Sequence, residues 1–131
     1  MDITGFIRRL LGLEVKPGEP EKLSDASFDE VIKEDGSLCF VHFYTLCSAS
    51  CQVMGGLLNE IGPNYIGKAN FYKMDIRDNP YTPQRFNITG VPAVVVFKDG
   101  KPVETLTRLT PLNQLKEWIE KNIQNLNSVD S

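Results

Sequence analysis

The feature that most constrains this chain is a nearly continuous run of apolar and aromatic residues from Leu38 to Tyr44. A strand with one face in water alternates apolar and polar side chains, whereas a strand buried on both faces is apolar throughout. The run therefore predicts a central, buried strand. A helix is expected to follow at once, from about Ser48 to Ile61, because Gly62-Pro63 is a pair that ends helices.

The other expected elements alternate in type along the chain. Ser24 is the predicted N-cap of a helix that ends at Asp35-Gly36, and Lys98-Asp99-Gly100-Lys101 has the Asp-Gly signature of a hairpin turn. Parallel pairing in the first half and antiparallel pairing in the second give one mixed sheet with helices on both faces, an α/β fold. The remaining elements are strands at 71–76, 94–97 and 103–107, a short helix from 78 to about 86, and a terminal amphipathic helix from 110 to about 124.

Size and charge limit the number of domains and the kinds of partner. The 131 residues suffice for one globular domain with its own core. The net charge is -3, the pI is about 5.1, and lysines and arginines are scattered, so nucleic acid is not an expected partner. No apolar run approaches the roughly 20 residues that span a bilayer, and the N-terminus lacks a signal-peptide pattern, so we expect a cytoplasmic protein.

The two ends of the chain differ from its central part. Apolar residues recur at helical spacing near the start and predict a short amphipathic helix, and two prolines and a glycine in 14–20 predict a linker. We divide the chain into an N-terminal helix and linker (1–22), a main domain (23–124) and a flexible tail (125–131). The N-terminal helix is expected to pack on its own domain, with membrane contact through residues 1–13 as the alternative. The apolar residues of this helix are Ile3, Phe6, Ile7, Leu10 and Leu11.

Three cysteines are too few for a disulfide framework and fit a reducing compartment, where paired cysteines are catalytic or bind a metal. Cys39 lies within the central strand and is expected to be a small core residue. Cys47 falls where the buried strand gives way to the helix. There, exposed N–H groups and the helix dipole favour the thiolate, so Cys47 is the predicted nucleophile and Cys51 the predicted resolving cysteine.

The spacing of this pair leaves its chemistry open. Residues four apart on a helix have Cβ atoms about 5–6 Å apart. A disulfide needs ~3.8 Å, although an unwound first turn can close the gap. Two helix cysteines with no redox role are one alternative, and a Cu(I) or Zn(II) site on the two thiolates is another.

Gly90-Val91-Pro92 comes directly before an apolar strand. Proline cannot donate a hydrogen bond to the ladder, so it must take the first position of the strand. A cis peptide bond at Pro92 would explain its presence there.

Several segments between about Leu23 and Ile123 carry a family likeness. They are the buried strand leading into a cysteine helix, Lys73-Met74-Asp75, Asn79-Pro80, Phe86-Asn87-Ile88-Thr89-Gly90-Val91-Pro92, Phe97-Lys98-Asp99-Gly100 and Gln114-Leu115-Lys116. Together they resemble the thioredoxin family. The resemblance implies the thioredoxin fold, with Pro92 as a cis-proline facing the active site and the Val91 backbone binding extended substrate polypeptide. Tyr44 and Ser48, on either side of the strand–helix junction, are further expected substrate contacts.

The active-site segment departs from that family. The family's Trp-Cys-Gly-Pro-Cys aligns with Cys47-Ser48-Ala49-Ser50-Cys51, so Cys47 takes the tryptophan position and Ser48 that of the first cysteine. The family's buried acid is replaced by His42, the only histidine, while the lysine beside that acid is kept as Lys73. A neutral imidazole can accept a proton from the resolving thiol, and a hydrogen-bonded core histidine is the alternative.

Residues 43–51 also resemble the motif of Sco-type copper chaperones, which add a downstream histidine ligand, yet no histidine follows His42. We therefore predict a thiol–disulfide oxidoreductase in which Cys47 attacks, Cys51 resolves, and His42 and Lys73 assist, without a cofactor. Its expected partners are protein disulfides and an electron donor similar to thioredoxin reductase. A Cu(I)- or Zn-binding protein and a redox-inert interaction domain are the alternatives.

Overall fold

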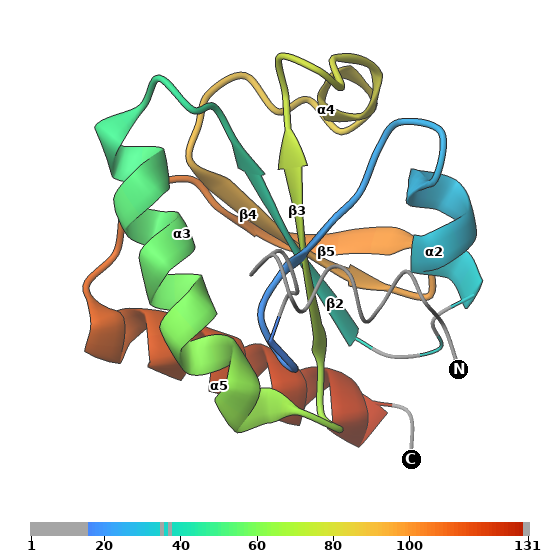
Figure 1. Ribbon diagram of the computed structural model, residues 1–131. Helices are drawn as coiled ribbons and strands as arrows, with labels where there is room; N and C mark the ends of the chain where they lie inside the picture. The colour runs from blue at the N-terminus through green and yellow to red at the C-terminus, as the bar shows by residue number, and fades with distance from the viewer. Residues whose placement is uncertain (1–15, 35, 37, 130–131) are drawn as a thin grey trace, which may run out of the picture.

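A five-stranded sheet with strand order β1-β3-β2-β4-β5 forms the centre of the computed structural model, which describes residues 16–34, 36 and 38–129 (Figure 1). The predicted N-terminal helix lies outside these residues. The strands are β1 (Glu21–Lys22), β2 (Leu38–Tyr44), β3 (Asn70–Asp75), β4 (Ala93–Lys98) and β5 (Lys101–Leu106). The helices are α2 (Phe28–Glu34), α3 (Ala49–Ile61), the 3-10 turn η1 (Gly62–Tyr65), α4 (Tyr81–Arg85) and α5 (Leu112–Val129).

The apolar run forms β2, the middle strand of the sheet, as predicted. Every residue of β2 is buried. β2 pairs with β3 in parallel and with β4 in antiparallel orientation, while β1 joins β3 in parallel and β5 joins β4 in antiparallel orientation. The predicted mixed sheet is confirmed, and so is the core position of Cys39, which is fully buried.

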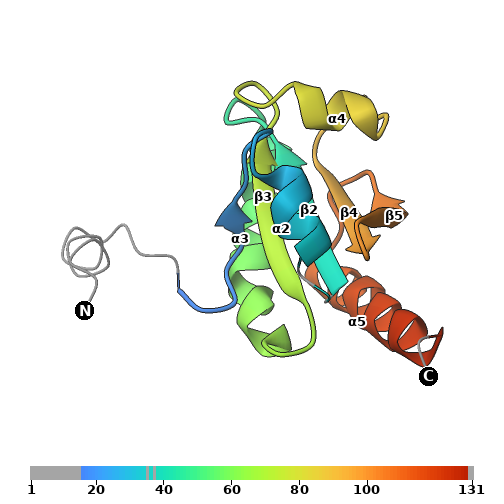
Figure 2. The ribbon, with the colours of Figure 1, turned by 90° about the vertical axis from the view of Figure 1, so that its right-hand side faces the viewer.

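Successive residues of β2 face two separate cores. Phe40 packs in a cluster with Leu58 of α3 and Ile119 of α5. Val41, on the opposite face, packs in a cluster with Phe28 of α2. Figures 1 and 2 show the same division, with α3 and α5 covering one face of the sheet and α2 the other. The helices on both faces therefore match the predicted architecture.

Trp118 connects α5 to the sheet. Its ring centroid lies 5.6 Å from that of Phe40 in an edge-on arrangement, and its indole N–H donates a 2.7 Å hydrogen bond to Oε1 of Glu104 on β5. A single side chain of α5 thus contacts both the central strand and the edge strand.

The turn between β4 and β5 has the predicted hairpin chemistry. Asp99 and Gly100 have φ values of +53° and +79°. A two-residue turn of type I′ needs positive φ at both central positions, which Asp and Gly tolerate better than other residues.

β1 is a strand that the sequence did not predict, since its residues fall in the predicted linker. Glu21 pairs with Tyr72 and Lys22 with Lys73, and the Leu23 N–H donates to the Lys73 carbonyl at 2.9 Å. Both residues of β1 are exposed, so no apolar pattern marks the strand. The folded unit therefore begins before Leu23.

α4 begins at Tyr81, three residues after the predicted start, and Asp25 caps it from a distant part of the chain. The Asp25 carboxylate accepts hydrogen bonds from the N–H groups of Tyr81 (3.1 Å) and Thr82 (2.9 Å) and from the Thr82 hydroxyl (2.6 Å). Partial burial acts to raise the pKa of Asp25, but these hydrogen bonds and the charge of Arg85 outweigh it and lower the pKa. The bonds supply the side-chain cap that Pro80 at the helix start cannot give.

α5 continues to Val129, beyond the predicted end near Gln124. Leu126 follows Ile123 by three residues and packs against the same core cluster, so the apolar face extends through the polar stretch. Among the described residues, the helices are all too short or too polar to cross a membrane.

Candidate active site

The predicted site residues gather at one edge of the sheet. β2 and β3 are parallel, so their carboxyl ends lie at the same edge, and the start of β4 joins them because Ala93 pairs with Phe43. The segments that follow β2 and β3 and the segment that precedes β4 all meet at this edge, at the top of Figure 1.

Cys47 and Cys51 have very different surroundings. Cys47 is exposed, whereas Cys51 is only 2% exposed and belongs to the first turn of α3. Ser48 is the N-cap of α3, and its Oγ accepts a hydrogen bond from the Cys51 N–H at 3.2 Å. Cys47 therefore lies just before the cap, outside the helix rather than in its first turn.

Arg77 contacts the sulfur of Cys47. Nη1 of its guanidinium donates to Cys47 Sγ at 3.0 Å. Arg77 follows the carboxyl end of β3, and its backbone N–H donates to Oδ1 of Asp75 at 3.0 Å, which fixes the turn. A guanidinium is always protonated, so its hydrogen bond to sulfur is stronger when the sulfur is a thiolate.

Cys51, His42, Lys73 and Tyr44 line one cavity of about 270 Å³ between the sheet and α3. His42 on β2 and Lys73 on β3 are paired in the parallel register, so their side chains leave the same face of the sheet. The resolving cysteine and both predicted catalytic neighbours thus share one space. The other lining residues are Thr45, Leu46, Gln52, Gly55, Gly56 and Asn59.

His42 is buried as a neutral imidazole. Burial, with a smaller contribution from the charge of Lys73, lowers the pKa of His42 to about 4. Among the described residues, none forms a hydrogen bond with its buried Nε2. Buried polar atoms in proteins usually have a hydrogen-bond partner, so this Nε2 stands out among the polar atoms of the site.

Tyr44 closes the same cavity beside His42. The two ring centroids are 5.5 Å apart. Burial raises the pKa of the Tyr44 phenol, and the negative charges of Asp75 and Asp78 raise it further. Tyr44 therefore stays a neutral hydroxyl at the pH where thiolates react.

Val91 and Pro92 lie directly before β4, which begins at Ala93, so Pro92 does not take the first position of the strand as predicted. The peptide bond between Val91 and Pro92 is cis. Pro92 is buried and Val91 is half-buried. Val91 also lines a cavity of about 430 Å³ between the segment before β4 and the edge strand β5. Both residues lie at the sheet edge that carries Cys47.

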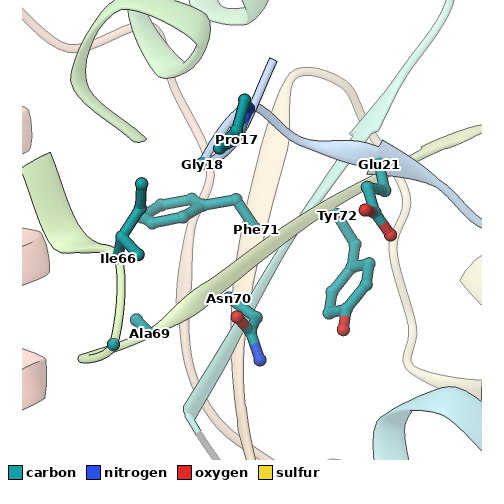
Figure 3. Close-up of a pocket in the computed structure, with 9 residues that line it drawn as sticks. Pro17, Gly18, Glu21, Ile66, Ala69, Asn70, Phe71 and Tyr72 are labelled. Carbon is teal, nitrogen blue, oxygen red and sulfur yellow. The ribbon is translucent and has the colours of Figure 1, made fainter. Parts of the chain in front are cut away.

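A further cavity of about 200 Å³ lies beside β1 and the first residues of β3 (Figure 3). Figure 3 shows Phe71 and Ile66 at one end of it and Glu21 and Tyr72 at the other. No cysteine lines it. Within the described part of the chain, His, Cys, Asp and Glu side chains form no group of three or more that could hold a metal ion.

Comparison with known proteins agrees with this geometry. Residues 19–121 match the family model for thioredoxin. The chain belongs to the thioredoxin family. Thioredoxin from Staphylococcus saprophyticus is 35% identical over 102 residues, which cover 78% of this chain and 96% of that protein, and thioredoxin from Staphylococcus haemolyticus is 33% identical over the same length. These relatives support a thioredoxin-type thiol–disulfide oxidoreductase.

Solved thioredoxin structures show the same fold. A mutant of thioredoxin from Halobacterium salinarum superimposes with a TM-score of 0.71 at 25% identity, covering 82% of this chain and 94% of that one. The resemblance to the thioredoxin family is therefore confirmed in both sequence and fold.

Two residues at the site were missed in the sequence. Arg77 is thirty positions from Cys47, and Gln52 donates from Nε2 to the Leu46 carbonyl at 3.0 Å, which ties the loop before α3 to the helix. Arg77 could have been predicted from its place just after the strand that pairs in parallel with β2, because the carboxyl ends of parallel strands meet at one edge of the sheet.

Proposed function

We propose that this thioredoxin-family protein exchanges disulfides with protein substrates through Cys47 and Cys51. The observation that carries the proposal is the contrast between an exposed Cys47 sulfur, held by a guanidinium, and a buried Cys51 in the first turn of the following helix. An exposed thiolate can reach a substrate disulfide, and a buried thiol next to it can react only with a partner already bound to the first.

In the first step, the Cys47 thiolate attacks one sulfur of the substrate disulfide. The substrate S–S bond breaks, a mixed disulfide forms between Cys47 and the substrate, and the other substrate sulfur leaves as a thiolate that takes a proton from solvent. Arg77 reaches Cys47 from outside the helix, so it leaves the sulfur open to a substrate.

In the second step, Cys51 loses its proton and attacks the Cys47 sulfur. The Cys47–Cys51 disulfide forms and the second substrate thiolate leaves, so that two electrons pass from the cysteine pair to the substrate. We assign the Cys51 proton to the neutral imidazole of His42, which lines the same cavity. Burial and the charge of Lys73 keep His42 neutral before the transfer, and because both disfavour its charged form, the imidazole must pass the proton on at once.

Substrate polypeptide is expected to bind along Val91 and Pro92. Pairing between β4 and β2 begins at Ala93, so the backbone of Val91 lies outside the ladder and is available to an extended chain. Tyr44 precedes and Ser48 follows Cys47 along the chain, and both are further expected substrate contacts. A thioredoxin-reductase-like protein would return electrons to the pair, and the cytoplasm would supply the reducing environment.

Reduction of a disulfide-bonded test protein, with dithiothreitol as the electron source, tests this proposal. The Cys47→Ser variant should lose the activity, whereas Cys51→Ser should retain the first step and accumulate a mixed disulfide that mass spectrometry detects on Cys47. Cys39→Ala serves as the matched control and should keep near-parent activity, because Cys39 is a core residue of β2.

Full activity of Cys47→Ser would contradict the assignment of the nucleophile. A parent protein that forms no Cys47–Cys51 disulfide in any glutathione buffer would contradict the redox function altogether. Titration with Cu(I) and Zn(II) would then test the metal-binding alternative.

A further inference from the structure

The sulfur of Cys47 has a charged partner on a separate loop of the chain. Arg77 Nη1 lies 3.0 Å from Cys47 Sγ, and the two residues are thirty positions apart in the chain. A contact between separate loops needs both loops to be held in place. The Arg77 turn is held by the bond from the Arg77 N–H to Asp75 and by a 3.0 Å bond from the Asn79 N–H to the Asp75 carbonyl.

Cys47 lies outside α3, two residues before its first residue. α3 begins at Ala49, and the Cys51 N–H of its first turn is already paired with Ser48 Oγ. Cys47 precedes this cap, and the influence of a helix dipole falls off beyond the first turn. The guanidinium of Arg77, in contrast, donates directly to the Cys47 sulfur.

Arg77 directs its charge at that sulfur rather than at a carboxylate. No carboxylate within residues 16–34, 36 and 38–129 forms an ion pair with Arg77. Asp75 accepts from the backbone N–H of Arg77, not from its guanidinium.

We propose that Arg77 is a positioning residue that stabilises the Cys47 thiolate and thereby makes the Cys47–Cys51 disulfide more oxidising. The inference rests on the proposed function. In the reduced pair the thiolate accepts a charge-assisted hydrogen bond, whereas a disulfide sulfur is uncharged and accepts only weakly. Arg77 thus favours the reduced form over the oxidised form, which is how a redox pair gains oxidising power.

When the pair acts as an oxidant, the exchange runs in the reverse direction. A substrate dithiol transfers two electrons to the pair, the Cys47–Cys51 bond breaks, and the substrate S–S bond forms. Cys51 takes one of the two substrate protons, and the other passes to solvent while Cys47 remains a thiolate next to Arg77. The favoured direction therefore shifts toward oxidation of the partner relative to a pair without the guanidinium.

The test compares Arg77→Met, which removes the charge, with Arg77→Lys, which keeps it. The equilibrium of the Cys47–Cys51 disulfide with glutathione is measured by thiol-specific mass tagging on the full chain. Arg77→Met should shift the equilibrium constant about tenfold toward the protein disulfide, which is about 30 mV for a two-electron couple. Arg77→Lys should lie within about threefold of the parent, since an ammonium keeps the charge but not the planar donor group.

Arg85→Met is the matched control and should leave the equilibrium constant unchanged. Arg85 is also exposed, but its guanidinium pairs with Asp29 at 2.9 Å and lies over the Phe86 ring. Equal equilibrium constants for the parent and Arg77→Met would overturn the inference.

A second measurement separates this inference from the proposed function. In a Cys51→Ser background no intramolecular disulfide can form, and the rate of Cys47 alkylation by iodoacetamide at pH 7 reports the thiolate directly. Arg77→Met should slow this rate several-fold relative to Arg77→Lys, whether or not the pair is redox-active. Equal rates would overturn the inference even if the parent reduces protein disulfides.

Discussion

At the scale of single residues, His42 differs most from what the thioredoxin resemblance alone implies. An imidazole occupies the place of a buried acid, and burial lowers its pKa to about 4. A buried acid carries a charge when it gives up its proton, whereas His42 is neutral in its working form. Resolution by Cys51 would therefore create a buried cation on His42 beside Lys73, which requires prompt release of the proton.

His42 also makes folding stability depend on pH. Its pKa is 6.5 in the unfolded chain and about 4 in the folded one, so the unfolded state binds more protons between these values. Proton uptake by His42 in the unfolded chain therefore leaves stability unchanged above about pH 6.5. It lowers the free energy of unfolding progressively as pH falls toward 4. Between pH 7.5 and pH 5 the free energy of unfolding should drop by about 2 kcal/mol.

Urea unfolding at pH 7.5, 6 and 5 measures this drop, and His42→Leu provides the comparison because leucine does not titrate. The lowered pKa values of Asp25 and Asp29 act only below their ordinary value of 3.8, outside this window. A parent protein as insensitive to pH as His42→Leu would refute a buried, neutral His42.

At the scale of elements, the start of α3 determines where each cysteine lies. Ser48 caps the helix, and removing its hydroxyl leaves the Cys51 N–H without that acceptor. Ser48→Ala should lower the free energy of unfolding by about 1 kcal/mol. Ser50→Ala, within the first turn of the same helix, is the matched control and should have no such cost, since alanine favours helix.

Urea unfolding of the two variants measures the difference. Equal stability of Ser48→Ala and Ser50→Ala would show that Ser48 does not cap α3. The start of α3 would then depend on its backbone hydrogen bonds and packing alone.

The elements differ in how far their sequences predict them. β2 was predictable because a strand buried on both faces is made almost entirely of apolar residues, and that run is visible in the sequence. The β4–β5 turn was predictable because Asp99-Gly100 tolerates positive φ. β1 was not, because Glu21 and Lys22 are exposed and the strand depends wholly on pairing with β3. The pair of cysteines could be located from local sequence, but the contact between Arg77 and Cys47 depends on the packing of two separate loops.

At the scale of the whole molecule, β1 decides where the folded unit begins. A chain of residues 16–131 should retain the sheet, whereas 24–131 loses β1, its pairing with β3 and the buried side chain of Leu23. Burying a leucine contributes about 2 kcal/mol, so the shorter chain should be less stable by at least that amount. Removal of β1 also exposes the edge of β3 to other chains.

Thermal unfolding of the two truncated chains, with light scattering at several concentrations, measures both effects. The chain of residues 24–131 should melt at a lower temperature and associate as concentration rises. Identical melting and no association would show that the folded unit does not need β1 or Leu23.

The position of Trp118 decides what optical spectroscopy can report on this protein. It is the only tryptophan, and its indole is held between Phe40 and Glu104, apart from the residues that line the Cys51 cavity. Its emission therefore follows the loosening of α5 from the sheet and gives a clean signal for unfolding. Oxidation of Cys47 and Cys51 needs a separate probe, so redox state and folding can be followed independently in one sample.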